Sequence, residues 1–100
     1  MPLPSACLST GVVAYNDDIG AEVIGAALRQ QLLIPQGLAV VGHDDAPISR
    51  LLLPSMTTIR VDTAGLGRYL AALALSAAQG IERPVADGTA IATLIKREST

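Results

Sequence analysis

The chain has 100 residues, of which 50% are hydrophobic and 16% charged, with a net charge of −2. This length fits one small domain or part of a larger one, and the low charged fraction suggests that part of its surface is covered by another subunit or segment. The largest basic cluster is Lys96-Arg97, which cannot neutralise a row of phosphates, so this chain alone is not expected to bind nucleic acid.

The start of the chain carries little functional signal. Residues 1–10 predict a loop or a frayed start, and the first five lack the positive region of a signal peptide. No apolar stretch reaches the roughly 18 residues of a membrane span. The single cysteine, Cys7, cannot form a disulfide within the chain, which by default indicates a reducing, cytoplasmic setting.

A strand, a helix and a second strand are predicted next. Apolar runs at residues 11–15 and 38–43 favour strands buried on both faces, as in parallel sheets. Between them, apolar residues recur at helical spacing as far as Leu32, after a cap at Asn16 or Asp17. This strand–helix–strand unit is close to the roughly 30 residues that such a unit needs.

The second half of the chain is dominated by one long predicted helix. Asp62 or Thr63 can cap its start, and Gly80 is a typical stop. The predicted elements are a turn at 46–50, a β-prone run at 57–61, a helix from 63 to about 79, a loop at 81–88 and a β-prone run at 89–98.

Polar side chains follow both predicted strands of the first unit. Asn16 and Asp17 come after the first strand, and Asp44 and Asp45 after the second. Ligands of open α/β sheets bind at the carboxyl ends of the strands, so a small polar ligand is expected here. Asn16 and Asp17 fit helix caps equally well. Adjacent side chains usually point to different sides, so one aspartate is expected to face a ligand and the other to tie the following turn.

Other kinds of site are less well supported. A metal site needs more ligands than the aspartates and the only histidine, His43, provide. Gly65 and Gly67 open a helix but lack the rest of a dinucleotide-binding pattern. His43 by itself is typical of a packed side chain at a strand end, and Arg60 and Arg68 are typical of solvated or helix-terminal residues. We therefore expect neither a catalytic centre nor a cofactor.

The order and spacing of four segments resemble the end of a LacI/GalR-type transcriptional regulator. The resemblance covers nearly the whole chain from Gly11 onward and implies an α/β fold, a partial three-layer sheet with parallel strands. Such regulators are similar to periplasmic sugar-binding proteins, with a two-lobed sensor domain behind a helix-turn-helix head. The four segments are Tyr15-Asn16-Asp17, residues 38–45, residues 54–60 and residues 97–100.

The resemblance implies roles for the polar residues. Asn16 matches the asparagine that contacts the effector, and Asp44 matches the aspartate that accepts hydrogen bonds from sugar hydroxyls. Asp17 and Asp45 match positions that support the site. His43 stands where the family usually has Phe or Tyr, and this departure is expected to alter the pocket wall and so the effector.

The resemblance also implies an organisation into lobes. A homodimer is expected, with the subunit interface at Ala21, Glu22, Leu52 and Leu53. The first lobe, the arginine that faces the sugar and the DNA-binding head are not in the chain, so a C-terminal piece of a regulator is expected. The implied parts are a second-lobe βαβ unit at 11–56, a hinge and first-lobe helix at 57–88 and a returning second-lobe strand at 89–100.

The function expected from these residues is effector sensing. A sugar or similar hydroxylated ligand would close the cleft and change the DNA affinity of the missing head. A fragment of a transport-type sugar-binding protein remains an alternative. So does, less favourably, a small α/β hydrolase using Asp44 and Asp45, for which the sequence offers no nucleophile–base pair.

Overall fold

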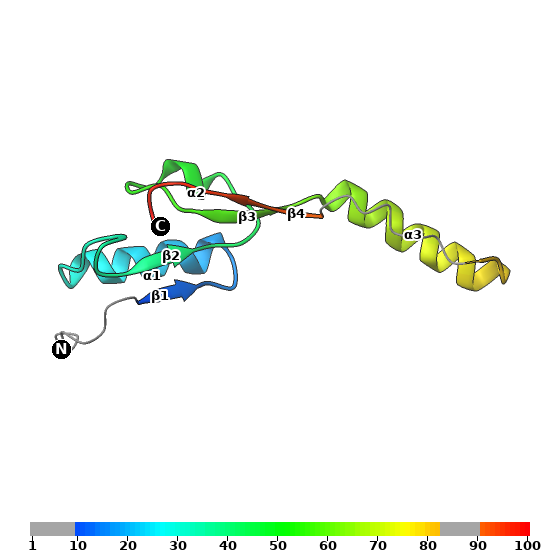
Figure 1. Ribbon diagram of the computed structural model, residues 1–100, viewed down its shortest axis with the longest axis horizontal. Helices are drawn as coiled ribbons and strands as arrows, with labels where there is room; N and C mark the ends of the chain where they lie inside the picture. The colour runs from blue at the N-terminus through cyan, green and yellow to red at the C-terminus, as the bar shows by residue number, and fades with distance from the viewer. Residues whose placement is uncertain (1–9, 83–90) are drawn as a thin grey trace. The chain divides into compact units, whose positions relative to one another are not determined.

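The computed structural model describes residues 10–82 and 91–100, which form four strands and three helices (Figure 1). Residues 1–9 and 83–90, which include Cys7 and most of the predicted loops at 1–10 and 81–88, lie outside the described residues. The chain divides into two compact units, one of residues 1–60 and 94–100 and one of residues 61–93. The elements are β1 (Gly11–Val13), α1 (Asp17–Arg29), β2 (Ala39–Val41), α2 (Ile48–Leu51), β3 (Thr58–Val61), α3 (Thr63–Gln79) and β4 (Ala92–Ile95).

Strands β1 and β2 form the predicted parallel pair. Gly11 lies opposite Ala39, and Val13 lies opposite Val41, which confirms an α/β unit with parallel strands. The prediction that both faces are buried is wrong for β1, because Val13 is 81% exposed. Val12 packs against the core, and its neighbour must therefore point to the opposite, uncovered face of the strand.

Helix α1 begins at its predicted cap. Asn16 has an extended backbone, and its Oδ1 accepts a hydrogen bond from the N–H of Ile19 at 2.9 Å. The predicted extension of the helix to Leu32 is wrong. The helix ends at Arg29, and Gln31 takes a left-handed φ of 66°, which turns the chain back toward β2.

A small apolar core joins α1 to β2 and the segment before β3. Val40 and Met56 are fully buried, and Ile24 contributes from α1. Partly buried side chains, among them Val12 and Leu52, pack around this cluster. The buried members are Ile24, Ala27, Ile34, Leu38, Val40 and Met56.

The predicted turn at 46–50 is wrong, because residues Ile48–Leu51 form the single helical turn of α2. The N–H of Leu52 donates to the carbonyl of Ile48 at 3.1 Å. Ser49 is fully buried, and its hydroxyl donates to the carbonyl of Ala46 at 2.7 Å. A helix of one turn is too short to show the apolar periodicity from which a helix is predicted.

The far side of β2 is covered by segments from later in the chain. The N–H of Gly42 donates to the carbonyl of Thr57 at 2.8 Å, and that of Val40 donates to the carbonyl of Ser99 at 3.0 Å. The hydroxyl of Ser99 donates to the carbonyl of Val40 and accepts from the N–H of Thr57. Residues 40, 57 and 99 thus form one buried polar seam.

The second unit contains the predicted long helix. The Oδ1 of Asp62 caps α3 by accepting from the N–H of Gly65 at 2.9 Å, and Gly80 ends it with a φ of 69°. Strand β4 lies within the predicted run at 89–98 and pairs with β3. Among the described residues of this unit only Ser76 is buried. None of the described helices is long and apolar enough to cross a membrane.

Candidate ligand-binding site

The carboxyl ends of β1 and β2 remain joined beyond the strands themselves. The N–H of Ala14 donates to the carbonyl of Val41 at 2.8 Å, and the N–H of Asp17 donates to the carbonyl of His43 at 3.0 Å. These bonds bring the two predicted groups of polar residues to neighbouring strand ends, as the sequence indicated.

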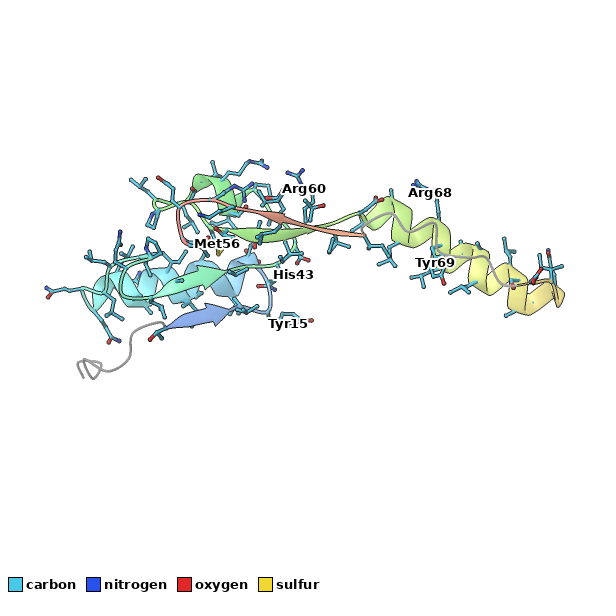
Figure 2. The ribbon with its side chains drawn as sticks, in the orientation of Figure 1. Tyr15, His43, Met56, Arg60, Arg68 and Tyr69 are labelled. Carbon is cyan, nitrogen blue, oxygen red and sulfur yellow. The ribbon has the colours of Figure 1, made fainter. Side chains whose placement is uncertain are left out.

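A pocket of about 390 Å³ lies at this edge and is lined by Tyr15, His43 and Asp44. Figure 2 shows Tyr15 and His43 beyond the ends of the two strands. The volume falls within the roughly 300–1,000 Å³ typical of small-molecule sites. An aromatic ring and a carboxylate at a strand edge suit a ligand with both an apolar face and hydroxyl groups.

Asp44 presents its carboxylate to this pocket from a fixed backbone. Its N–H donates to the carbonyl of Ile59 at 2.8 Å, and its φ is 103°, which is uncommon outside glycine. Its Oδ1 lies 2.7 Å from Nδ1 of His43, and the two side chains are 58% and 45% exposed. His43 is therefore half exposed at the pocket rather than packed.

Asp45 turns away from the solvent and is held by two arginines. Its Oδ1 accepts from Arg97 at 2.8 Å, and its Oδ2 accepts from Nη2 of Arg60 at 2.7 Å. The Asp45 side chain is only 5% exposed. Hydrogen bonds from Arg97 and then Arg60 lower the pKa of the Asp45 carboxyl to about 2. This aspartate has no free oxygen turned to a ligand and instead ties the turn after β2 to later segments.

Asp17 is buried beneath the same edge. Its Oδ2 accepts from the N–H of Ala46 at 2.6 Å, and its Oδ1 accepts from the hydroxyl of Thr58 at 2.6 Å. A Cβ atom at Gly42 would collide with the Asp17 carboxylate and crowd the sulfur of Met56. The glycine thus leaves room for a polar link between the start of α1, the turn after β2 and β3.

Asn16 lies at the end of β1, but its Oδ1 is occupied in capping α1. It is not among the described residues that line the pocket, so its contact with a ligand stays a prediction. Of the supporting residues, Asp17 and Asp45 lie behind the edge and His43 lies on it.

The sequence did not single out three residues that matter here. Tyr15 is 86% exposed at the pocket, and its position just before Asn16 was an available signal. Arg60 was expected to be solvated or helix-terminal. Its side chain is 58% exposed, and the sequence did not indicate that it also pairs with Asp45. Arg97 lies 52 residues from the aspartate it binds, and no local pattern could have linked them. Nowhere in residues 10–82 and 91–100 do three potential metal-ligating side chains gather.

Ligands of open α/β sheets bind at the carboxyl ends of the strands, which is where this parallel unit presents the exposed carboxylate of Asp44. Comparison with known families agrees, because residues 2–100 match the periplasmic binding protein-like domain. The chain belongs to this family.

Its relatives confirm the resemblance to LacI/GalR-type regulators. It is 37% identical over 90 residues to the HTH-type transcriptional regulator GalS of Salmonella typhimurium, covering 90% of this chain and 26% of GalS. It is 37% identical over 93 residues to the ribose operon repressor of Bacillus subtilis, covering 90% of this chain and 28% of that repressor. The chain thus spans about a quarter of these relatives. Both are named as regulators of transcription.

Solved structures show the same fold. A LacI family regulator from Arthrobacter sp. FB24, in complex with lactose, matches with a TM-score of 0.67 and 30% identity, over 93% of this chain and 35% of that one. A complex of the transcriptional regulator CelR with cellobiose matches with a TM-score of 0.73 and 28% identity, over 95% of this chain and 29% of that one.

Proposed function

We propose that this chain is part of the effector-sensing domain of a bacterial transcriptional regulator, and that the pocket at Tyr15, His43 and Asp44 contacts a small hydroxylated ligand such as a sugar. The observation that carries the proposal is the Asp44 carboxylate, exposed beside the pocket while its backbone is fixed by Ile59. The similarity to regulators whose structures are complexes with lactose and cellobiose supports the same ligand class.

Within this proposal, Asp44 and Asn16 bind the ligand, while Asp17, His43 and Asp45 support it. Asn16 retains an amide N–H₂ for this role, since only its oxygen is used as a cap. A hydrolytic role for the aspartate pair is not favoured. Asp45 is held by two guanidinium groups and is therefore a poor general base.

The proposal for the whole protein follows its relatives. Ligand binding closes a cleft, and the resulting change reaches DNA through an N-terminal head. Residues 11–56 and 89–100 belong to the second lobe, and residues 57–88 to the hinge and first lobe. The regulator is a cytoplasmic homodimer with an interface at Ala21, Glu22, Leu52 and Leu53, and it needs no cofactor or catalytic residue.

The binding role of Asp44 is tested by titrating the isotope-labelled chain with D-ribose, D-galactose, lactose and cellobiose, and following backbone amide signals by NMR. At least one sugar is expected to shift signals at the pocket. Asp44→Ala, and Asp44→Asn as a variant that tolerates positive φ, are expected to weaken binding about 10-fold or more, because a charge-assisted bond of about 1.5–3 kcal/mol is lost.

Asp18→Asn is the matched control, since Asp18 is exposed in the first turn of α1 and does not line the pocket. Equal affinity of the Asp44 variants and the native chain would reject the role of Asp44.

The regulatory part of the proposal is tested in the gene. Sequencing the DNA upstream of Met1 is expected to reveal an in-frame helix-turn-helix segment. An in-frame secretion signal followed by a sugar-binding lobe would instead favour a transport protein and overturn the regulatory assignment.

A further inference from the structure

The contact between His43 and Asp44 fixes which ring nitrogen of the histidine carries hydrogen. Nδ1 of His43 lies 2.7 Å from Oδ1 of Asp44, and a carboxylate oxygen can only accept. Nδ1 is therefore the donor. In the neutral ring the other nitrogen, Nε2, then carries a lone pair and is an acceptor. Among the described residues, His43 makes no side-chain hydrogen bond through Nε2.

Two residues that line the same pocket therefore each keep one hydrogen-bond acceptor. These acceptors are Nε2 of His43 and Oδ2 of Asp44, since Oδ1 is already occupied by the histidine. Both side chains are about half exposed and line the same pocket. Two neighbouring acceptors match two neighbouring donors, which adjacent hydroxyl groups of a sugar ring supply.

The charge of the lining supports the same ligand class. Of the described residues that line the pocket, only Asp44 is a charged type, and none is Lys or Arg. A carboxylate without a lining cation repels an anionic ligand. The open ring of Tyr15 provides a face on which the apolar side of a sugar can stack.

We propose that His43 determines which sugars the pocket binds. Asp44 accepts a hydrogen bond from one hydroxyl of a neutral sugar, and His43 accepts one from the neighbouring hydroxyl. The same arrangement disfavours the binding of sugar acids. This inference rests on the proposed function, because it assigns a ligand class to the same pocket. The inference extends the supporting role of His43 given above to a direct contact with the ligand, so substitution of His43 changes the preference between ligands and not only the overall affinity.

The test uses matched probes that differ at one carbon, D-glucose with D-glucuronate and D-galactose with D-galacturonate. D-ribose, lactose and cellobiose extend the neutral set. The full chain is titrated by NMR, with every probe and variant measured in the same buffer. The native chain is expected to bind a neutral sugar about 10-fold more tightly than its acid.

Three variants separate the two nitrogens of the ring. His43→Asn keeps an N–H near the position of Nδ1 but removes the acceptor at Nε2. The affinity for the neutral sugar is therefore expected to fall about 5- to 10-fold, and the preference for the neutral sugar over its acid is expected to become smaller. His43→Gln places an amide oxygen near the position of Nε2 and is expected to recover most of the native affinity and most of the native preference. His43→Met, similar in length to Gln but without a hydrogen-bonding end, is expected to remain weak.

The outcomes separate this inference from the function on which it rests. If Asp44→Asn weakens binding while His43→Asn and His43→Met keep native affinity and preference, the role of His43 is wrong and the sugar site stands. If His43→Asn does not fold, His43→Gln against His43→Met decides, and equal binding by these two rejects the inference. If none of the probes binds the native chain, the site and the inference both fail.

Discussion

At the scale of single residues, the neighbouring aspartates Asp44 and Asp45 lie in different environments. Asp44 is open to the pocket, whereas Asp45 is held by Arg60 and Arg97. Both have positive φ, 103° and 55°, and this local twist helps to send successive side chains in different directions. The arginines therefore stabilise the backbone from which Asp44 is presented.

The ion pairs of Asp45 predict how stability depends on pH. The pKa of this carboxyl falls from 3.8 to about 2 in the folded chain, so the native state favours the charged form. The resulting stabilisation is complete above about pH 4 and is lost as the pH falls toward 2, which we expect to cost about 1–2 kcal/mol. Urea unfolding between pH 6 and pH 2.5 measures this loss.

Asp45→Asn, which suits the positive φ, should be less stable than the native chain at pH 6 and lose less stability below pH 4. Asp18→Asn, at an exposed position, is expected to keep the native pH dependence. An Asp45→Asn variant with the native dependence would contradict the assignment of the ion pairs.

Gly42 is a second residue with a measurable role. Gly42→Ala would press a methyl group against the buried Asp17 carboxylate and the sulfur of Met56. We expect a loss of about 2 kcal/mol or more in the free energy of unfolding. Gly11→Ala is the control, because the nearest atom to its added carbon is the carbonyl oxygen of Ala39 at 3.8 Å. Equal stabilities of the two variants by urea unfolding would show that the close approach at Gly42 is not tight.

At the scale of elements, the two glycines inside α3, Gly65 and Gly67, are expected to respond differently to substitution by alanine. An added methyl at Gly67 meets nothing within 4 Å, so Gly67→Ala is expected to stabilise the helix by about 0.5–1 kcal/mol. Circular dichroism at 222 nm should show higher helicity. Gly65→Ala should not bring this gain, because its methyl would collide with the capping carboxylate of Asp62. Unchanged helicity in Gly67→Ala would argue against a formed α3 in solution.

The elements also show what the sequence can reveal. The ends of α3 were predictable because Asp62 and Gly80 are chemical signals at the boundary itself. The parallel pairing of β1 and β2 followed from two apolar runs around a helix. The single turn of α2 left no such pattern, and the early end of α1 depends on the left-handed turn at Gln31.

The site was predictable only where it is local. Polar residues directly after a strand mark its carboxyl end, so Asp44 and His43 could be placed at an edge from sequence. Which aspartate faces outward is decided by Arg60 and Arg97, 15 and 52 residues beyond Asp45. Periodicity reports on neighbours along the chain and carries no information about such distant partners.

At the scale of the whole molecule, apolar side chains remain exposed in both units. Leu53 in the first unit is 85% exposed, and Leu70 and Leu75 on α3 in the second unit are also exposed. Large exposed apolar patches mark contact surfaces, and these leucines are candidates for such a surface. The predicted interface includes Leu53, so self-association is expected to use that surface.

Light scattering at micromolar concentration is expected to give a mass about twice the 10.3 kDa of one chain. Leu53→Asp should reduce the mass to that of a monomer, because it places a charge in the contact. Leu70→Asp is the matched substitution on α3 and should leave the dimer intact. A dimer that survives Leu53→Asp but not Leu70→Asp would assign the contact to α3, and a native monomer would reject self-association.

The seam that joins β2 to Ser99 has a consequence for biosynthesis. Val40 is made 59 residues before the serine whose hydroxyl it binds. During translation the backbone N–H and C=O groups on this side of β2 therefore stay unpaired until Ser99 is made. Such groups can pair with the backbone of other chains. Closing a contact of such long sequence separation is also slow. The growing polypeptide is thus most exposed to aggregation after β2 has emerged and before Ser99 is released from the ribosome.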